Sequence, residues 1–158
     1  MSEKVFKGLP VGSENYKDIM DNDLYYVDKT AYIKTVFKES SSVLLITRPR
    51  RFGKTLTLNT FAAFLKLNEQ DPDDTGLQQR LFKDTEIIKD REFCREFMGK
   101  FPVISITLKD IYGDSFGDAY RMFADLVCTT ANKYAYLLKS PALSVYEKKS
   151  EASGISVG

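Results

Sequence analysis

Residues 43–56 read Val-Leu-Leu-Ile-Thr-Arg-Pro-Arg-Arg-Phe-Gly-Lys-Thr-Leu, and this stretch decides the expected fold. Together with Ser42, its first part is a short, continuous apolar run, which is typical of a strand buried on both faces of a parallel sheet. A helix is expected to begin near Lys54, with an apolar face made by Leu58, Phe61, Ala62 and Leu65. The stretch therefore predicts a strand, a loop and a helix in direct succession.

The loop carries half of a phosphate-binding motif. Gly53-Lys54-Thr55 matches the end of the P-loop pattern G-x-x-x-x-G-K-[ST]. The first turn of a helix has unpaired backbone N–H groups and a partial positive charge, and a phosphate satisfies both. We expect Gly53 to let the phosphate approach closely, Lys54 to reach the β- and γ-phosphates, and the Thr55 hydroxyl to bind Mg²⁺.

The other half of the motif differs from the standard pattern. Arg48 replaces the first glycine, and Pro49 has no N–H to donate to a phosphate. Arginine side chains are therefore expected to replace some of the backbone donors. Four of the seven residues 48–54 are basic in a chain of net charge +1, which indicates a local anion site. The alternative interpretation is a basic surface turn at the start of a helix.

The remaining chain predicts alternating elements. Asp28 can cap a helix from about Thr30 to Lys38, and Val103–Leu108 has the β-branched composition of a second strand. Further helices are expected near residues 77–82 and 90–98, and after Ser115, which has capping-box spacing to Asp118. We assign the aromatic stripe of that last helix to the core. This order predicts an α/β fold with a P-loop NTPase-like parallel sheet flanked by helices.

Composition excludes several classes of protein. The chain has 158 residues and no histidine, which excludes a His-based metal site and a Ser-His or Cys-His hydrolase. Cys94 and Cys128 are expected to be buried thiols in a reducing compartment. The sequence shows neither a signal peptide nor an apolar run long enough to span a bilayer, so we expect a cytoplasmic protein without a membrane partner.

Several segments resemble the AAA-ATPase-like family, whose members carry an R-P-R-R-F-G-K-[ST]-L loop. The resemblance is strongest at Leu44–Leu56, and Tyr26–Thr30 is similar to the family's Y-x-D-K-T segment. Leu9–Gly12 with Asn15 and Tyr16 resembles its N-terminal arm, and Phe101–Ile104 with Leu108–Asp110 resembles its second strand. Longer members continue to a Walker B strand and often to a nuclease-like domain of the PD-(D/E)XK class. Neither follows here, and Asp110 is the nearest substitute for the Walker B carboxylate. For Asp110 we favour a place in the loop after the second strand, where it caps local backbone.

The resemblance implies binding of ATP and Mg²⁺, with Thr55 as the metal ligand and no assigned catalytic residue. The implied binding residues are Arg48, Arg50, Arg51, Phe52, Gly53, Lys54, Thr55 and Leu56. For Asp28 and Lys29, we favour a helix cap and a solvated lysine over contact with nucleotide. The expected organisation is an arm at 1–22, a partial ATPase-like domain at 23–140 with an incomplete sheet, and a flexible tail at 141–158.

Two other functions remain open at this stage. The basic loop could bind nucleic acid or a protein partner without nucleotide turnover, or the chain could be a truncated, inactive fragment. Self-association, or docking of a missing C-terminal segment, would cover the apolar edges of an incomplete sheet. In every case ATP hydrolysis is doubtful, because no Walker B segment supplies a carboxylate to hold Mg²⁺ and polarise water.

Overall fold

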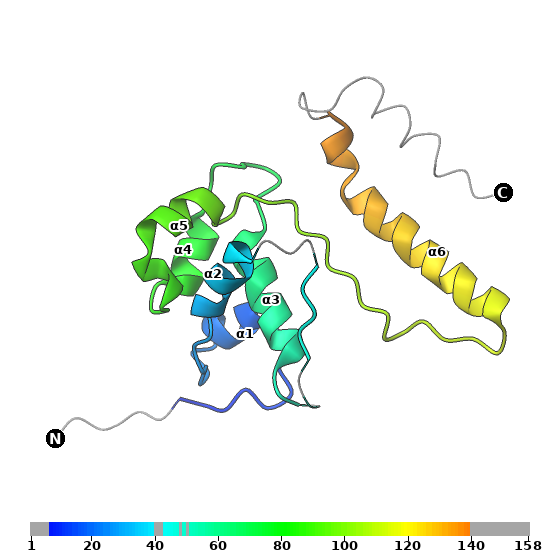
Figure 1. Ribbon diagram of the computed structural model, residues 1–158, viewed down its shortest axis with the longest axis horizontal. Coiled ribbons are helices and arrows are strands. Elements are labelled where there is room, and N and C mark those ends of the chain that lie inside the picture. Colours follow the sequence, from blue (N-terminus) through cyan, green and yellow to red (C-terminus); the bar gives the residue numbers. More distant parts are fainter. Residues whose placement is uncertain (1–6, 40–42, 48, 50, 140–158) are drawn as a thin grey trace. The chain divides into compact units, whose positions relative to one another are not determined.

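Helices are the main regular elements of the computed structural model, which describes residues 7–39, 43–47, 49 and 51–139 (Figure 1). In chain order they are α1 (Tyr16–Asp21), α2 (Ala31–Lys38), α3 (Lys54–Leu65), α4 (Gly76–Phe82), η1 (Ile87–Lys89), α5 (Arg91–Phe97), α6 (Phe116–Lys133) and η2 (Ala135–Lys139). The chain divides into two compact units, one that ends at Val103 and one that begins at Ile104.

The predicted parallel sheet does not form among the described residues, so the prediction of an α/β P-loop fold is wrong. Residues 43–47 and 103–108 form neither helix nor strand, and Ser42 lies outside the described residues. Val43 and Leu45 are 83% and 82% exposed, and Ile104 is 59% exposed. An apolar run becomes a strand only where a neighbouring strand hydrogen-bonds to it. The described ranges contain no such ladder.

Side-chain caps mark the starts of α1, α5 and α6, and the sequence predicted the cap of α6. Asn15 caps α1 by accepting a hydrogen bond from Lys17 N at 3.0 Å, and Asp90 caps α5 by accepting from Phe93 N at 3.1 Å. Ser115 Oγ accepts from Asp118 N at 3.2 Å at the start of α6, which confirms the predicted capping-box spacing. These caps act within a few residues and therefore can be predicted from sequence.

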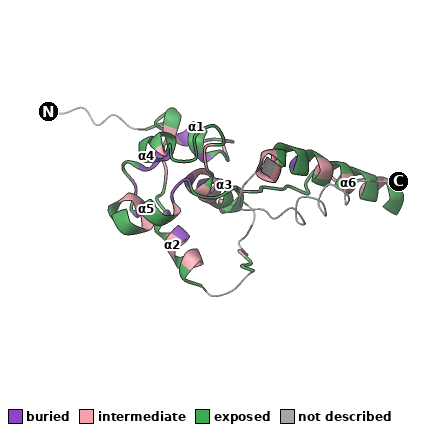
Figure 2. Ribbon diagram, turned by 90° about the horizontal axis from the view of Figure 1, so that it is seen from above, coloured by how far each residue is buried: buried purple, intermediate pink, exposed green. Residues whose placement is uncertain are grey.

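The core of the first unit lies where α1, α2, α3 and α4 meet, and buried positions are purple in Figure 2. Phe64 of α3 and Phe82 of α4 are fully buried, with ring centroids 5.3 Å apart. Tyr16 of α1 packs on Phe82 at 4.8 Å, and Ile33 of α2 is fully buried. Aromatic burial is the main source of stability in a unit this small.

The buried face of helix α3 matches the predicted one only in part. Leu58 is half exposed, whereas Thr57, Thr60 and Phe64 are buried. Thr57 Oγ1 donates to Gly53 O at 2.9 Å and Thr60 Oγ1 to Leu56 O at 2.8 Å. With their hydroxyl groups bonded to the helix backbone, these threonines can be buried at little cost. Of the predicted face, Phe61 and Leu65 are partly buried against the core, whereas Leu58 is not.

Three backbone hydrogen bonds fix the C-terminal end of α3. Gly99 N donates to Phe64 O, Phe101 N to Leu65 O, and Leu67 N to Phe101 O, each at 2.9 Å. Gly99 has a φ of 66°, a left-handed conformation that suits the end of a helix such as α5. The end of α3 near Phe64 is thus attached to residues 99–101.

Helix α6 and η2 are the helices that the structure describes in the second unit. Residues Phe116, Tyr120, Phe123 and Val127 are exposed, so the predicted assignment of this stripe to the core is wrong. Thr130 is the one buried residue of α6, and Figure 2 shows the helix mainly in green and pink. A stripe of apolar residues at helical spacing requires a facing element before it becomes a core.

Candidate functional site

The loop before α3 leads into the helix at the predicted residue. Lys54 is the first residue of α3, and Gly53 precedes it as N-cap with φ 71° and ψ 29°. This left-handed conformation is strained for residues with a Cβ and unstrained for glycine. Arg51 also has a positive φ of 65°, and Phe52 N donates to Pro49 O at 3.4 Å. Arg48 and Arg50, two of the predicted site residues, lie outside the described residues.

The first turn of α3 faces solvent. Lys54 and Thr55 are exposed, Leu56 is half-buried, and no side-chain cap bonds to the start of this helix among the described residues. Both the backbone N–H and the hydroxyl group of Thr57 bond to Gly53 O at 2.9 Å, which fixes the glycine relative to the helix. An exposed helix start with a glycine at the N-cap can accept an anion on its backbone N–H groups.

A cavity of about 370 Å³ lies beside this helix start. Four predicted site residues line it, namely Arg51, Phe52, Gly53 and Leu56. The other lining residues come from the N-terminal arm, from the segment before α2 and from α3: Pro10, Tyr25, Tyr26, Val27, Lys29, Thr57, Thr60 and Phe61. Lys54 and Thr55 are not among the lining residues. The fold thus brings the predicted loop next to the segment before α2. In that segment the sequence favoured a helix cap for Asp28 and a solvated lysine for Lys29.

The walls of the cavity combine aromatic rings, hydroxyl groups and two cations. Phe52 is 63% exposed, and Tyr25 is also exposed. Burial raises the pKa of Tyr26, against hydrogen bonds from Thr60 and from the backbone of Lys29 that lower it, so its phenol stays neutral at ordinary pH. Lys29 and Arg51 are the charged lining residues that the structure describes. A cavity of this kind fits an anionic molecule that also has a flat, apolar part.

Hydrogen bonds hold the segment before α2 against the region around η1. Asp28 Oδ1 accepts from Thr30 N at 2.8 Å, and Asp28 Oδ2 accepts from Glu86 N at 2.6 Å. Thr30, which is fully buried, accepts from Ile87 N at 3.1 Å through its hydroxyl oxygen. The N-cap of α2 is Thr30, two residues after Asp28, so the prediction that Asp28 caps this helix is wrong. No signal in the sequence identified its bond to Glu86, 58 residues away.

The sequence matches the protein family described as Predicted AAA-ATPase over residues 10–155. The chain belongs to this family. The resemblance expected from the arginine-rich loop is therefore confirmed, while the associated nuclease-like domain is not shown. A protein from Azotobacter chroococcum mcd 1, described as an uncharacterized protein in the vnfD 5' region, is 41% identical over 73 residues. That match covers 46% of this chain and 14% of the relative. No solved structure matches the chain.

Membership of the AAA-ATPase family suggests nucleotide and metal dependence in general terms. Within the part of the chain that the structure describes, no cluster of three or more His, Cys, Asp or Glu residues could hold a metal ion. Mg²⁺ in nucleotide sites usually takes one or two protein ligands, with phosphate oxygens and water for the rest. The exposed Thr55 hydroxyl can fill one such position, so the residues present are compatible with a shared Mg²⁺ ion.

Two further predictions can be compared with the structure. Asp110, the nearest substitute for a Walker B carboxylate, belongs to the second unit, and no acidic residue is among the described lining residues of the cavity. None of the helices in the described ranges has the length and apolar character needed to traverse a bilayer. Both cysteines are free and half-buried, rather than fully buried as predicted.

Proposed function

We propose that this AAA-ATPase family member binds ATP with Mg²⁺ at the start of α3 and in the cavity beside it. The supporting observation is the left-handed Gly53, which begins a helix with an exposed first turn at the edge of a cavity lined by aromatic and cationic residues. A phosphate chain needs the helix start, whereas a nucleoside needs the cavity. Their proximity favours a nucleotide over a simple phosphate ion.

Each residue of the loop has a proposed role in this site. Gly53 permits close approach of backbone and phosphate, Lys54 contacts the β- and γ-phosphates, and the Thr55 hydroxyl binds Mg²⁺. The remaining site residues add positive charge or enclose the ligand: Arg48, Arg50 and Arg51 by charge, Phe52 and Leu56 by contact. We propose binding without assigning a hydrolytic step, because no carboxylate in the described part of the cavity wall could polarise water.

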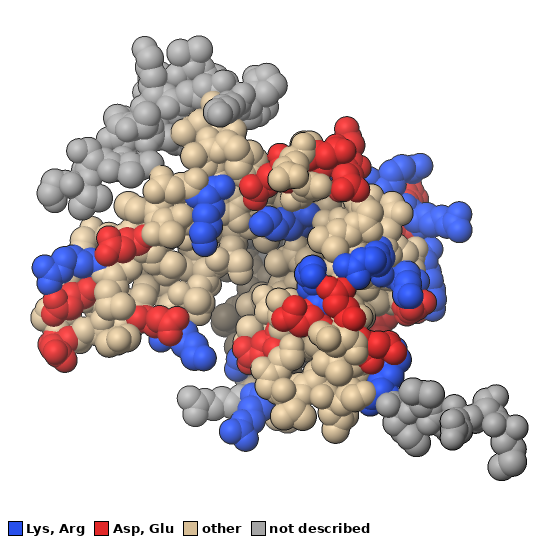
Figure 3. Space-filling model, turned by 180° about the vertical axis from the view of Figure 1, so that it is seen from behind, with Lys and Arg blue, Asp and Glu red and all other residues tan. Residues whose placement is uncertain are grey.

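The distribution of charge supports a nucleotide ligand over a nucleic acid. On the face drawn in Figure 3, Lys and Arg side chains are interspersed with Asp and Glu side chains. The whole chain carries a net charge of +1. Nucleic-acid backbones bind to extended basic surfaces, which make affinity strongly salt-dependent. The free thiols also agree with a cytoplasmic location, which we propose on that basis.

Equilibrium titration with fluorescently labelled ATP, with and without Mg²⁺, tests the proposal. Lys54→Ala should lower the affinity by about tenfold or more, because it removes a charge-assisted hydrogen bond. Lys66→Ala is the matched control, since Lys66 is the C-cap of the same helix and its ammonium pairs with Glu69 at 3.6 Å. Equal affinities for the wild type and Lys54→Ala would refute the proposal. Tight binding of a single-stranded oligonucleotide with no dependence on Mg²⁺ would favour the nucleic-acid alternative.

A further inference from the structure

Lys29 is a cation at the cavity whose charge is not neutralised by the acidic residue beside it. Asp28 directs both carboxylate oxygens to backbone N–H groups, those of Thr30 and Glu86. Across the described ranges Lys29 forms no ion pair. Most other lysines of the first unit, including Lys7, Lys17, Lys34, Lys89 and Lys100, pair with a carboxylate within 4 Å. An unpaired ammonium at the wall of a cavity without described carboxylates is suited to an anionic ligand.

The position of Lys29 depends on contacts from distant parts of the chain. On one side of it, Asp28 bonds to Glu86 N, and on the other side Thr30 bonds to Ile87 N. Thr30 and Ile87 are buried, at 0% and 1% exposure. The backbone of Lys29 is also one of the groups that lower the pKa of Tyr26, another lining residue. The backbone of Lys29 is therefore held on both sides before any ligand arrives, which lowers the entropy cost of binding.

We propose that Lys29 binds a phosphate oxygen of the nucleotide, and that Asp28 and Thr30 are positioning residues that hold it at the cavity. This inference rests on the proposed nucleotide binding. It adds a phosphate-binding cation from outside the loop at residues 48–55. Arg51 lines the same cavity, so the two cations, from the segment before α2 and from the loop, would contact one anion.

The test compares ATP affinity among variants that change charge at one position. Lys29→Gln should weaken ATP binding by about tenfold, because a charge-assisted hydrogen bond is lost. Lys29→Arg should retain most of the affinity, since the charge remains. Lys83→Gln, an exposed lysine outside this cavity, is the matched control and should bind as the wild type does. Competition by adenosine, which has no phosphate, should be equal for wild type and Lys29→Gln.

A double-mutant cycle tests the positioning role. Asp28→Asn removes the charge and one of the two acceptor oxygens of this side chain. In the otherwise wild-type protein it should therefore weaken ATP binding. In the Lys29→Gln background the same change should have little further effect, because it acts through Lys29. A merely structural role for Asp28 would give the same fold-change in both backgrounds and would overturn the positioning assignment. Circular dichroism and a thermal melt on each variant show that the fold is retained.

The outcomes separate this inference from the proposed function. If wild type binds ATP and Lys54→Ala does not, but Lys29→Gln binds normally, the role of Lys29 is wrong while the proposed function stands. If Lys29→Arg binds as poorly as Lys29→Gln, the charge is not what matters, and the phosphate contact is refuted. If the wild type does not bind ATP, both proposals fail together.

Discussion

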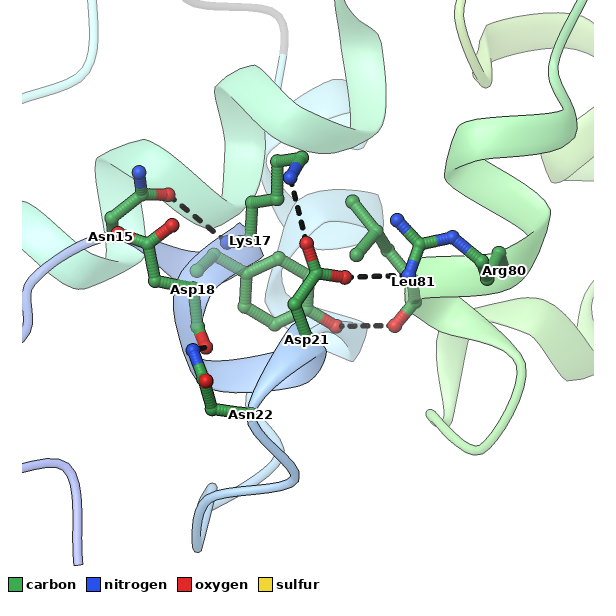
Figure 4. Close-up of polar contacts among 8 residues, drawn as sticks. Asn15, Lys17, Asp18, Asp21, Asn22, Arg80 and Leu81 are labelled. Carbon is green, nitrogen blue, oxygen red and sulfur yellow. Dashed lines mark hydrogen bonds and ion pairs between the residues drawn. The ribbon is translucent and has the colours of Figure 1, made fainter.

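The phenolic hydroxyl of Tyr16 donates a hydrogen bond to the backbone carbonyl oxygen of Leu81, at 3.2 Å and across 65 residues of chain. Both residues are buried. Figure 4 shows this bond beside the ion pair of Asp21 with Arg80, which connects the same two helices, α1 and α4, at the surface. Asp21 also pairs with Lys17 within α1. Arg80 and Lys17 hold the pKa of the Asp21 carboxyl below its usual value, Arg80 having the larger effect. Helix α1 is thus attached to α4 by one buried and one exposed polar contact.

Tyr16→Phe should destabilise the first unit by about 1 kcal/mol, because Leu81 O loses its donor while the ring keeps its packing. Urea denaturation followed by circular dichroism measures this difference. Tyr25→Phe is the control, since Tyr25 is 55% exposed and should change stability by less than about 0.5 kcal/mol. Equal midpoints for Tyr16→Phe and wild type would show that the buried hydrogen bond contributes nothing.

Stability should fall as the pH rises above about 10. Burial, followed by the nearby Tyr26 and Asp28, raises the pKa of Tyr16 above its ordinary value. Below the unfolded pKa both states keep the proton, and stability is unaffected. Above it the unfolded state ionises while the folded state does not, so folding loses up to about 1.4 kcal/mol per pH unit for this group. Denaturation midpoints between pH 8 and 11 measure the slope, which should be smaller in Tyr16→Phe. An unchanged slope in that variant would contradict the assignment.

Substitutions at Gly53 should destabilise the start of α3, least with asparagine, more with alanine and most with valine. A Cβ at this position would meet no atom within 4 Å, so the cost comes from the left-handed backbone and not from a clash. Alanine should cost about 1–2 kcal/mol, asparagine less, and a β-branched valine more. Thermal melts give the ranking, and labelled ATP shows whether affinity follows it. If Gly53→Val is as stable as the wild type, Gly53 does not adopt this conformation in solution.

The apolar run Val43–Leu45 should bind a dye that reports exposed hydrophobic surface. All three of its residues are exposed, and adjacent exposed apolar side chains form the kind of surface that such dyes recognise. A double variant with Val43→Ser and Leu45→Ser should bind less 1-anilinonaphthalene-8-sulfonate than the wild type. Leu58→Ser, a single exposed leucine on α3, is the control and should leave the fluorescence nearly unchanged. A wild type that does not bind the dye would show that this run is covered in solution.

Local features of this chain could be predicted from sequence, whereas its tertiary pairings could not. The start of α3 at Lys54 and the Ser115 cap depend on residues within one turn, so their signals are in the sequence itself. The predicted strands at residues 43–47 and 103–108 needed partners, and no local pattern states whether partners are available. The burial of Thr57 and Thr60 in α3 was missed, because the hydroxyl groups of these threonines bond to the helix backbone.

In the candidate site, too, the local features could be predicted from sequence and the tertiary contacts could not. Its loop was predicted from the motif, and Arg51, Phe52, Gly53 and Leu56 do line one cavity. Tyr25 and Lys29 were not assigned to it, because they reach the loop only once α2 packs and Asp28 bonds to Glu86. The bond between Asp28 and Glu86 joins residues that are 58 positions apart. The predicted residues Arg48 and Arg50 lie outside the described ranges.

Helix α3 is stabilised unequally at its two ends. Near Phe64 its backbone is tied to residues 99–101 by three hydrogen bonds, whereas at Gly53 it has no side-chain cap among the described residues. Amide hydrogen exchange should therefore be slow at residues 64–67 and faster toward residue 53. A ligand that binds at the glycine end would slow exchange there and leave the far end unchanged. Exchange at residues 64–67 thus serves as an internal reference for exchange near residue 53. The comparison measures how much of the protein has ligand bound, without any label near the ligand.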